Sequence, residues 1–167
     1  MLHRSENAMS ADNQQERLDA NWIVGFTDGE GCFYVALNRL PKMTLGWQVL
    51  PEFRIVQHKR DEIVLYKIRE YFGFGNVTKN HGDRNEFRVR GLKNLNQLIK
   101  FFRKNQLKTS SKRKSFEIFS EIIEMMNNRK HMTREGLNQI AVLASRMNRQ
   151  TKPKFLESSE TIRRTNQ

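Results

Sequence analysis

The stretch from Trp22 to Gly31 places two carboxylates at the end of an apolar run that is rich in small residues. It reads W-I-V-G-F-T-D-G-E-G and occurs once in the chain. Its first part has the composition of a buried helix, and the glycines on either side of Glu30 tolerate the backbone angles that end one. Because a helix C-terminus carries partial negative charge, Asp28 and Glu30 are unfavourable there unless a cation compensates them. We therefore expect a metal site at this helix end.

The chain is strongly basic, which indicates a polyanionic partner. It contains 30 Lys and Arg against 18 Asp and Glu, for a formal charge of +12 and a pI near 10.2. Because each phosphate that a cationic side chain neutralises releases counterions, this balance favours nucleic acid. The charge alone also fits a basic ribosomal or RNA-packaging protein, but that class of protein does not explain the D-G-E-G sequence.

Length and composition indicate one domain in a reducing compartment. The 167 residues are enough for one buried core, and a single Cys cannot form an internal disulfide. The N-terminus lacks a secretory pattern, and no apolar run approaches the roughly 18 residues that span a bilayer. We expect an intracellular protein, in a bacterial cytoplasm or an organelle, with no membrane partner and no small-molecule substrate. The expected divisions are a flexible segment over 1–14, a domain over 15–149 and a polar tail over 150–167.

Periodicity predicts an α+β domain in the order α-β-β-α-β-β-α-α-α. A helix from about residue 15 to Thr27 precedes a strand over 32–40, a turn over 40–46 and a strand that includes 53–58. A helix from Asp61 stops at the glycines at 73 and 75, and a hairpin follows over 76–90 around H-G-D. Three more helices are expected over 95–104, 115–127 and 133–147, the last capped by Thr133.

The stretch Ile23 to Gly31, I-V-G-F-T-D-G-E-G, resembles the signature motif of the LAGLIDADG homing endonucleases. The element order matches their αββαββα fold with additional C-terminal helices. The sequence K-H-M-T-R-E-G-L-N-Q-I followed by R-M-N, over 130–148, resembles the C-terminal region of many members. The resemblance implies an antiparallel four-stranded sheet that forms a saddle on double-stranded DNA. It also implies an intron-encoded enzyme that cleaves both strands of a long, near-palindromic site by metal-dependent hydrolysis.

A single motif copy implies, through this resemblance, a homodimer. In the family the motif helices pack against each other across a two-fold axis, and small residues let their backbones approach closely. The residues expected at this interface are Trp22, Gly25, Phe26 and Asp28.

The resemblance also implies the residues at the reaction centre. Glu30 matches the acidic metal ligand of the family, with the carbonyl of Gly29 beside it, and Asp28 is either a further ligand or a structural cap. Hard oxygen ligands suit Mg²⁺, with Mn²⁺ as a substitute and Ca²⁺ as a non-catalytic mimic. Such ions would polarise the scissile phosphates and lower the pKa of the attacking water. Gln57 matches a position near the metal and this water.

Two positions depart from the family pattern. Asp61 stands where some homodimeric relatives carry an active-site Arg, and Arg60 is the nearest basic residue. Ser110 stands where relatives often have a Lys, which leaves Lys108 or Lys112 to serve, and we assign Lys112 to catalysis. These departures keep a second interpretation open, in which the chain is an intron maturase that holds RNA or a DNA-binding regulator that does not cleave.

Base contacts are expected from the outward positions of the strands. Arg pairs bidentately with guanine and Asn with adenine in the major groove, whereas Lys in loops more often holds phosphates. For any one position the alternative is a solvated strand face, but the three strand arginines together are expected to form a basic stripe. The candidate DNA-binding residues are Tyr34, Ala36, Asn38, Arg54, Thr78, Asn80, Glu86, Arg88 and Arg90, with Lys108 and Lys114 near the basic run.

Overall fold

The computed structural model describes residues 17–147 and 154–157. The expected N-terminal segment 1–14 and most of the expected tail lie outside the described residues. In the described part, the predicted order of helices and strands is confirmed, with two short 3-10 helices (η1 and η2) and the four-residue helix α7 added. The elements are α2 (Ala20–Glu30), β1 (Gly31–Arg39), β2 (Trp47–His58), η1 (Lys59–Asp61), α3 (Ile63–Phe72), β3 (Asn76–Lys79), β4 (Arg84–Val89), α4 (Leu92–Lys104), α5 (Ser110–Asn127), η2 (Lys130–Met132), α6 (Arg134–Ser145) and α7 (Lys154–Glu157).

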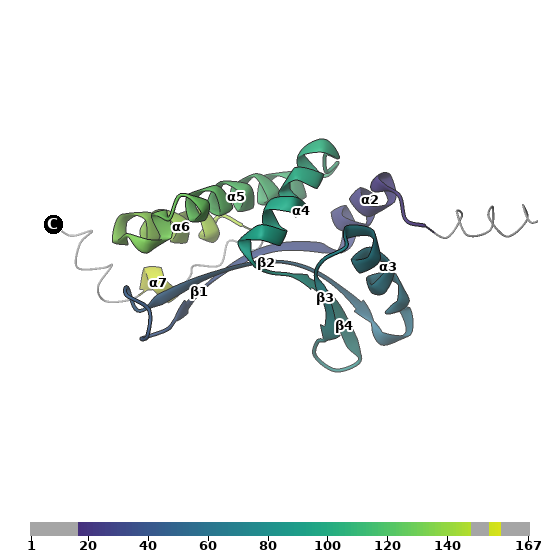
Figure 1. Ribbon diagram of the computed structural model, residues 1–167, viewed down its shortest axis with the longest axis horizontal. Helices are drawn as coiled ribbons and strands as arrows, with labels where there is room; N and C mark the ends of the chain where they lie inside the picture. The colour runs from purple at the N-terminus through teal and green to yellow at the C-terminus, as the bar shows by residue number, and fades with distance from the viewer. Residues whose placement is uncertain (1–16, 148–153, 158–167) are drawn as a thin grey trace, which may run out of the picture.

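The four strands form one antiparallel sheet in the order β1-β2-β4-β3. The sheet is bowed, with α2, α4, α5 and α6 on its convex side, and no helix of the described residues lies beneath its concave side (Figure 1). Alternation along the strands separates a buried set of side chains from an outward set, as the period of two predicted. The predicted α+β saddle is therefore confirmed.

Phenylalanines fill the space between the sheet and the helices. Phe33 of β1 is fully buried, and its ring lies 5.0–5.6 Å, between centroids, from four others. Because these rings come from β1, β2, α4 and α5, they join the sheet to two helices that follow it much later in the chain. The four neighbours of Phe33 are Phe53, Phe102, Phe116 and Phe119.

The bounds of α2 differ from the prediction at both ends. The helix begins at Ala20, where Asp19 caps it by accepting a hydrogen bond from the Trp22 N–H at 2.8 Å, and it continues through Glu30. The expectation that Gly31 supplies unusual backbone angles is wrong, because its φ is −72°. A Cβ atom at Gly31 would instead lie 2.6 Å from Cγ2 and 2.8 Å from the carbonyl oxygen of Thr27. Close packing against the preceding turn is what requires this glycine.

Other helix ends follow the predicted chemistry more closely. Gly73 ends α3 with a φ of 71°, and the Thr133 side chain caps α6 by accepting from the Gly136 N–H at 3.1 Å. The start of α5 is earlier than predicted, at Ser110, so the basic run lies in its first turns.

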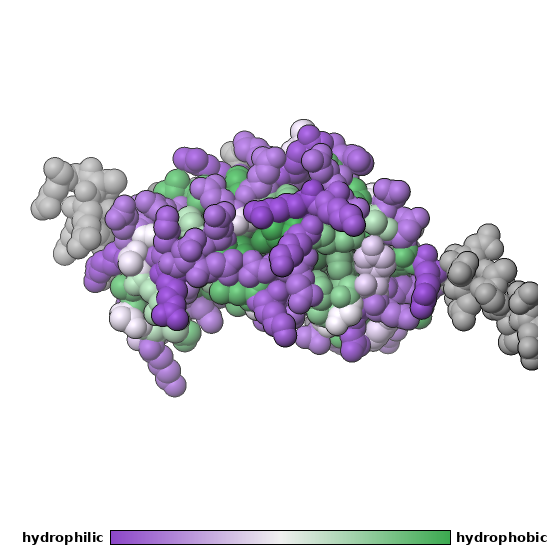
Figure 2. All heavy atoms as spheres, turned by 45° about the horizontal axis from the view of Figure 1, so that its top comes forward, coloured by the Kyte–Doolittle hydropathy of each residue, from purple (hydrophilic) through white to green (hydrophobic). Residues whose placement is uncertain are grey.

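Part of the expected polar tail is packed on the domain. Residues 154–157 form α7, and the ring of Phe155 makes an edge contact with Trp47 at 5.2 Å between centroids. Hydrophilic residues cover most of the face seen in Figure 2. None of the described helices combines the length and the apolar character needed to cross a bilayer.

Replacing Phe33 tests the aromatic core. We expect Phe33→Ala to lower the free energy of unfolding by about 3–5 kcal/mol, because the cavity left behind removes contacts to four rings. Urea denaturation measures the loss. Tyr34→Ala is the matched control on the opposite face of β1, and it should cost about 1 kcal/mol or less, since Tyr34 loses only its contact with Arg54. Equal losses for the two variants would contradict the described packing.

Candidate functional site

The C-terminal end of α2 lies against the N-terminal end of α5. The carboxylate of Asp28 accepts hydrogen bonds from the backbone N–H groups of Lys108 at 2.7 Å and Thr109 at 3.1 Å, and from Oγ1 of Thr109 at 2.9 Å. Both carboxylate oxygens are used, and the partial positive charge at the start of α5 adds to the attraction. Of the two roles left open for Asp28, the geometry favours the structural one, as a cap on α5.

Lys112 makes a second contact across the same helix ends. Its Nζ donates a hydrogen bond to the backbone carbonyl of Gly31, the residue that follows Glu30. The first turns of α5 therefore bring an ammonium group to the acidic end of α2. We call this arrangement, made by Asp28, Gly31, Lys108, Thr109 and Lys112, the α2–α5 junction. Lys112, which the sequence assigned to catalysis, is thereby bound to the residue that follows Glu30 in the chain.

Glu30 is the carboxylate that stays open. It is the last residue of α2 and is exposed, and within the described part of the chain no hydrogen bond or ion pair involves its carboxylate. The last carbonyls of a helix, here including that of Gly29, have no partner of the i+4 type within it. This end of α2 thus presents oxygen donors of the kind that hard divalent cations bind.

One chain alone supplies too few ligands for such a cation. Among residues 17–147 and 154–157, no group of three or more His, Cys, Asp or Glu is placed to hold a metal ion. A hard cation takes six or more oxygens, so DNA phosphates, water and a second motif would have to complete the set. The oxygen donors at Glu30 and Gly29 fit a divalent ion only as part of a larger assembly.

Gln57 lies at the strand end that meets α2. Gly31 at the start of β1 pairs with Ile55 of β2, and Gln57 follows two residues later on the same side of the sheet. This register places Gln57 on β2 just beyond the start of β1, where α2 ends. The half-buried Gln57 is paired with Asn85 of β4, whose side chain donates to Glu62.

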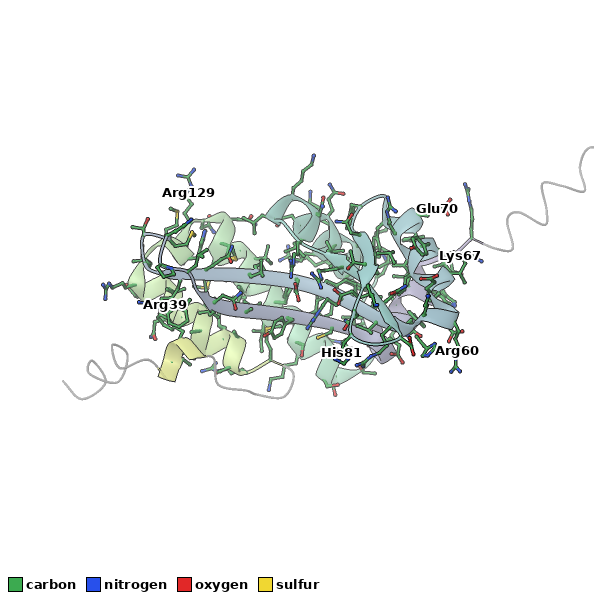
Figure 3. All side chains as sticks on the ribbon, turned by 90° about the horizontal axis from the view of Figure 1, so that it is seen from below. Arg39, Arg60, Lys67, Glu70, His81 and Arg129 are labelled. Carbon is green, nitrogen blue, oxygen red and sulfur yellow. The ribbon has the colours of Figure 1, made fainter. Side chains whose placement is uncertain are left out.

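Arg60 is a less favourable cation than Lys112 for this site. It lies on η1, beyond the end of β2, and its Nε is 3.3 Å from Oδ2 of Asp61. Both side chains are largely exposed, at 78% and 59%. Figure 3 shows Arg60 at the edge of the molecule, at the end of the sheet opposite Arg39. The described contacts therefore favour Lys112 over Arg60 as the basic residue that replaces the Arg and Lys found in relatives at positions 61 and 110.

A separate face of α2 is open. The rings of Trp22 and Phe26 stack with 4.6 Å between centroids, and Trp22 is 38% exposed. A Cβ atom at Gly25 or Gly29 would meet nothing within 4 Å. These residues recur at helical spacing, opposite the buried side of α2, and they form an aromatic and glycine face able to contact another helix closely. The expected interface residue Asp28 does not share this face, since it is bound to α5.

The concave side of the sheet carries the expected DNA-binding positions. Tyr34, Asn38 and Thr78 are exposed on it, and Ala36, Arg54, Arg88 and Asn80 are half-buried. The guanidinium of Arg54 lies over the ring of Tyr34, at 5.1 Å from its centroid. Lys114 is exposed on α5, and the hydrogen bonds that Lys108 makes at the α2–α5 junction use its backbone.

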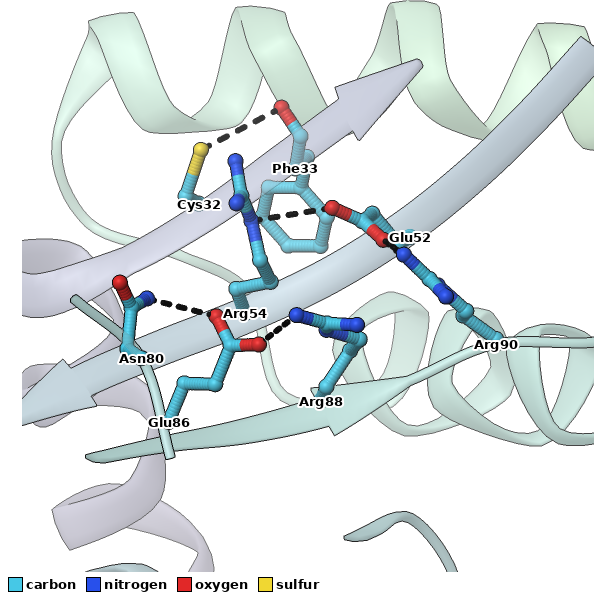
Figure 4. A network of polar contacts seen from close by, with 8 residues as sticks. All are labelled: Cys32, Phe33, Glu52, Arg54, Asn80, Glu86, Arg88 and Arg90. Carbon is cyan, nitrogen blue, oxygen red and sulfur yellow. Dashed lines mark hydrogen bonds and ion pairs between the residues drawn. The ribbon is translucent and has the colours of Figure 1, made fainter. Parts of the chain in front are cut away.

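The expected basic stripe is wrong in one respect, because carboxylates lie beneath it (Figure 4). Glu86, expected to point outward for base contact, is fully buried and paired with Arg88, and it accepts from Asn80 at 2.8 Å. Glu52, which the sequence interpretation did not select, is also buried and holds Arg54 and Arg90. The period of two along β2 could have identified Glu52, because it lies on the same strand face as Arg54.

Comparison with known proteins yields a consistent group of relatives. The family model for LAGLIDADG endonucleases matches residues 23–123. The probable intron-encoded endonuclease 2 of Neurospora crassa is 37% identical over 126 residues, which cover 74% of this chain and 28% of that protein. The chain spans about a quarter of the length of the curated relatives that match at this level.

Solved structures show the same fold. The homing endonuclease I-TnaI is 47% identical with a TM-score of 0.80, and the match covers 89% of this chain and 98% of that one. The LAGLIDADG homing endonuclease I-LtrWI, solved bound to its target DNA, is 32% identical with a TM-score of 0.78. This second match covers 90% of this chain and 54% of that one.

Removing the Asp28 carboxylate tests its structural role. We expect Asp28→Ala to lower the free energy of unfolding by about 0.5–2 kcal/mol, the usual cost of losing a helix cap. Thermal or urea denaturation of the metal-free protein measures it. Glu30→Gln, two residues away and without a described partner, should change stability by no more than about 0.5 kcal/mol. An Asp28→Ala variant with an unchanged free energy of unfolding would contradict the capping role and favour a metal-ligand role instead.

Proposed function

Because this chain belongs to the LAGLIDADG endonuclease family, we propose that it is a site-specific homing endonuclease that hydrolyses both strands of a long, near-palindromic DNA site. The observation that supports this most is the open Glu30 carboxylate at a helix end where the Lys112 ammonium binds the carbonyl of the next residue, Gly31. An acid and a cation at one helix end suit phosphodiester hydrolysis, in which negative charge grows on the phosphate. Relatives named as intron-encoded endonucleases also support an origin within an intron for this chain.

We infer that Glu30, Gln57 and Lys112, which lie at or near the α2–α5 junction, have distinct roles. Glu30, with the Gly29 carbonyl, would hold a divalent ion, Mg²⁺ or Mn²⁺ for cleavage and Ca²⁺ for binding alone. When bound, this ion supplies Lewis-acid stabilisation of the scissile phosphate and a more acidic water. Gln57 would orient that water by hydrogen bonding. Lys112 has three N–H donors, so it can keep the Gly31 carbonyl and still donate to a phosphate oxygen.

The open face of α2 supports a homodimer. Two copies of this chain can pack these faces across a two-fold axis, with Trp22 and Phe26 buried and Gly25 at the closest approach. This brings two Glu30 carboxylates together, each near one DNA strand. The near-complete coverage of I-TnaI supports a single-motif unit of this size, whereas the chain matches about half of I-LtrWI.

Replacing Glu30 tests the cleavage proposal. We expect Glu30→Gln to slow cleavage at least about a hundredfold, the scale of losing one electrostatic stabiliser at a reaction centre, while DNA affinity stays near that of the wild type. The substrate is a duplex of the fused sequences that flank the intron, incubated with Mg²⁺ and resolved on a gel. Glu117→Gln, an exposed carboxylate on α5, is the charge-matched control.

Cleavage by Glu30→Gln at the wild-type rate would refute the role of Glu30. A wild-type protein that binds the duplex in Mg²⁺ without cutting would support the alternative, a DNA-binding or RNA-binding protein on the same scaffold. Binding of the intron RNA by that protein would then identify the maturase form.

Replacing Trp22 tests the dimer. We expect Trp22→Glu to convert a dimer to a monomer in sedimentation velocity, because a carboxylate would be buried without a partner between the α2 faces. Tyr66→Glu changes an exposed aromatic residue of α3, 44% exposed, and should leave the mass unchanged. A wild-type chain that remains monomeric when bound to DNA would exclude the homodimer.

A further inference from the structure

Two buried carboxylates hold the arginines of the concave sheet face in place. Glu52 and Glu86 are 4% and 0% exposed, whereas the side chains of Arg54, Arg88 and Arg90 are 30–45% exposed. Figure 4 shows the five side chains as two ion-pair groups on one sheet face, Glu52 with Arg54 and Arg90, and Glu86 with Arg88. We refer to the two groups together as the network. The guanidinium groups thus face the solvent above the carboxylates that bind them.

The strand register explains why the carboxylates are needed. Arg54 and Arg88 are direct partners across β2 and β4, and like charges in that position repel. Glu52 lies two residues before Arg54 on the same strand face, and Glu86 lies two residues before Arg88. Each carboxylate therefore sits diagonal to the arginine pair and offsets one of its charges.

Glu52 is the more connected of the two carboxylates. Its Oε1 is 3.1 Å from Nε of Arg54, and its Oε2 accepts from Nε and Nη2 of Arg90 at 2.7 and 2.6 Å. It thereby joins an arginine of β2 to one that follows β4. Arg54 is held from a second side by the ring of Tyr34. The described contact of Arg54 with Glu52 is made through Nε, whereas that of Arg90 is made through Nε and Nη2. The Nη groups are the donors that read guanine bidentately.

The network also lowers the net charge of the surface. Three arginines over two carboxylates carry a net charge of only +1. Sequence-independent binding to DNA grows with the number of phosphates that cations neutralise. An arginine that must leave a buried carboxylate to reach a phosphate loses a charge-assisted hydrogen bond, whereas one that reads a base from its present position does not. The arrangement therefore favours contacts of these arginines with base edges over contacts with the phosphates of the DNA backbone.

We propose that Glu52 is a positioning residue for base recognition. It fixes Arg54 and Arg90 toward the major groove, where they read base pairs that present two acceptors, as guanine does, and it weakens their attraction to phosphates of arbitrary sequence. This role rests on the proposed function as a site-specific enzyme. It assigns sequence preference to a carboxylate that need not touch the DNA.

Glu52→Gln tests this role in two binding measurements without Mg²⁺. The first is a salt titration with a duplex of arbitrary sequence. We expect tighter binding, by about threefold or more at low salt, and a log–log salt slope steeper by about 0.9 for each additional phosphate that the variant neutralises. The second is selection of bound sequences from a randomised duplex pool. We expect preference to fall by about fivefold or more at a few base pairs only.

Matched variants distinguish the positioning role from a general effect of protein charge and from a loss of stability. Glu121→Gln removes one carboxylate from the exposed side of α5 and should alter neither the salt slope nor the selected bases. Arg54→Gln should lose preference at base pairs that Glu52→Gln also affects, without the increase in affinity for arbitrary DNA. If Glu52→Gln does not fold, the Arg54→Gln and Arg90→Gln variants test the proposal instead. Each of them must then lose sequence preference at only a few neighbouring base pairs.

The outcomes are distinct. Glu52→Gln that binds arbitrary DNA more weakly, or loses preference evenly along the site, would overturn the positioning role. So would Arg54→Gln and Arg90→Gln variants that keep every preferred base. A wild-type protein that selects no preferred sequence would overturn site-specific function as well. A wild type with preferred bases that Glu52→Gln leaves unchanged would overturn this role alone.

Discussion

The negative end of α2 is held against the positive end of α5, and the geometry of the candidate site depends on this contact. Asp28 accepts three hydrogen bonds from the residues just before α5, and Lys112 returns a donor to the carbonyl of Gly31. Opposite partial charges of two helix ends make the approach favourable before any side chain is added. With Asp28 occupied in this way, Glu30 is the carboxylate of the motif that remains open, and the residue after it is bound by a lysine 81 positions later in the chain.

The same chemical group serves different purposes here because its surroundings differ. The carboxylate of Asp28 accepts from two backbone N–H groups and one hydroxyl and joins α2 to α5. That of Glu30 is exposed and without a described partner, which is the state a cation requires. The carboxylates of Glu52 and Glu86 are buried beneath arginines, where they offset charge and fix orientation. Burial and available donors, more than residue type, separate the structural contacts of Asp28 from the proposed catalytic role of Glu30 and the proposed positioning role of Glu52.

Local patterns predicted the elements well and their ends less well. Alternation identified the buried and outward positions of β1 and β2, and Gly73 and Thr133 ended and began their helices as their chemistry indicates. The bounds of α2 and α5 moved by several residues because capping contacts decide where a helix end is satisfied: Asp19 caps α2 locally, whereas Asp28 binds the residues just before α5 from far along the chain. Phe155 lies on Trp47 although the tail around Phe155 and Leu156 is mostly polar, a tertiary contact that a composition argument cannot detect.

The sequence alone determined the family motif, the order of the elements, the faces of the strands and the basic charge, because each follows from residues close together in the chain or from simple counts. Only the tertiary structure decided that Asp28 binds residues 108 and 109, that Lys112 reaches Gly31, and that Glu52 joins Arg54 to Arg90. These pairs lie up to 81 residues apart. Their meeting depends on how the sheet and helices pack, and packing energy is not encoded in any local period.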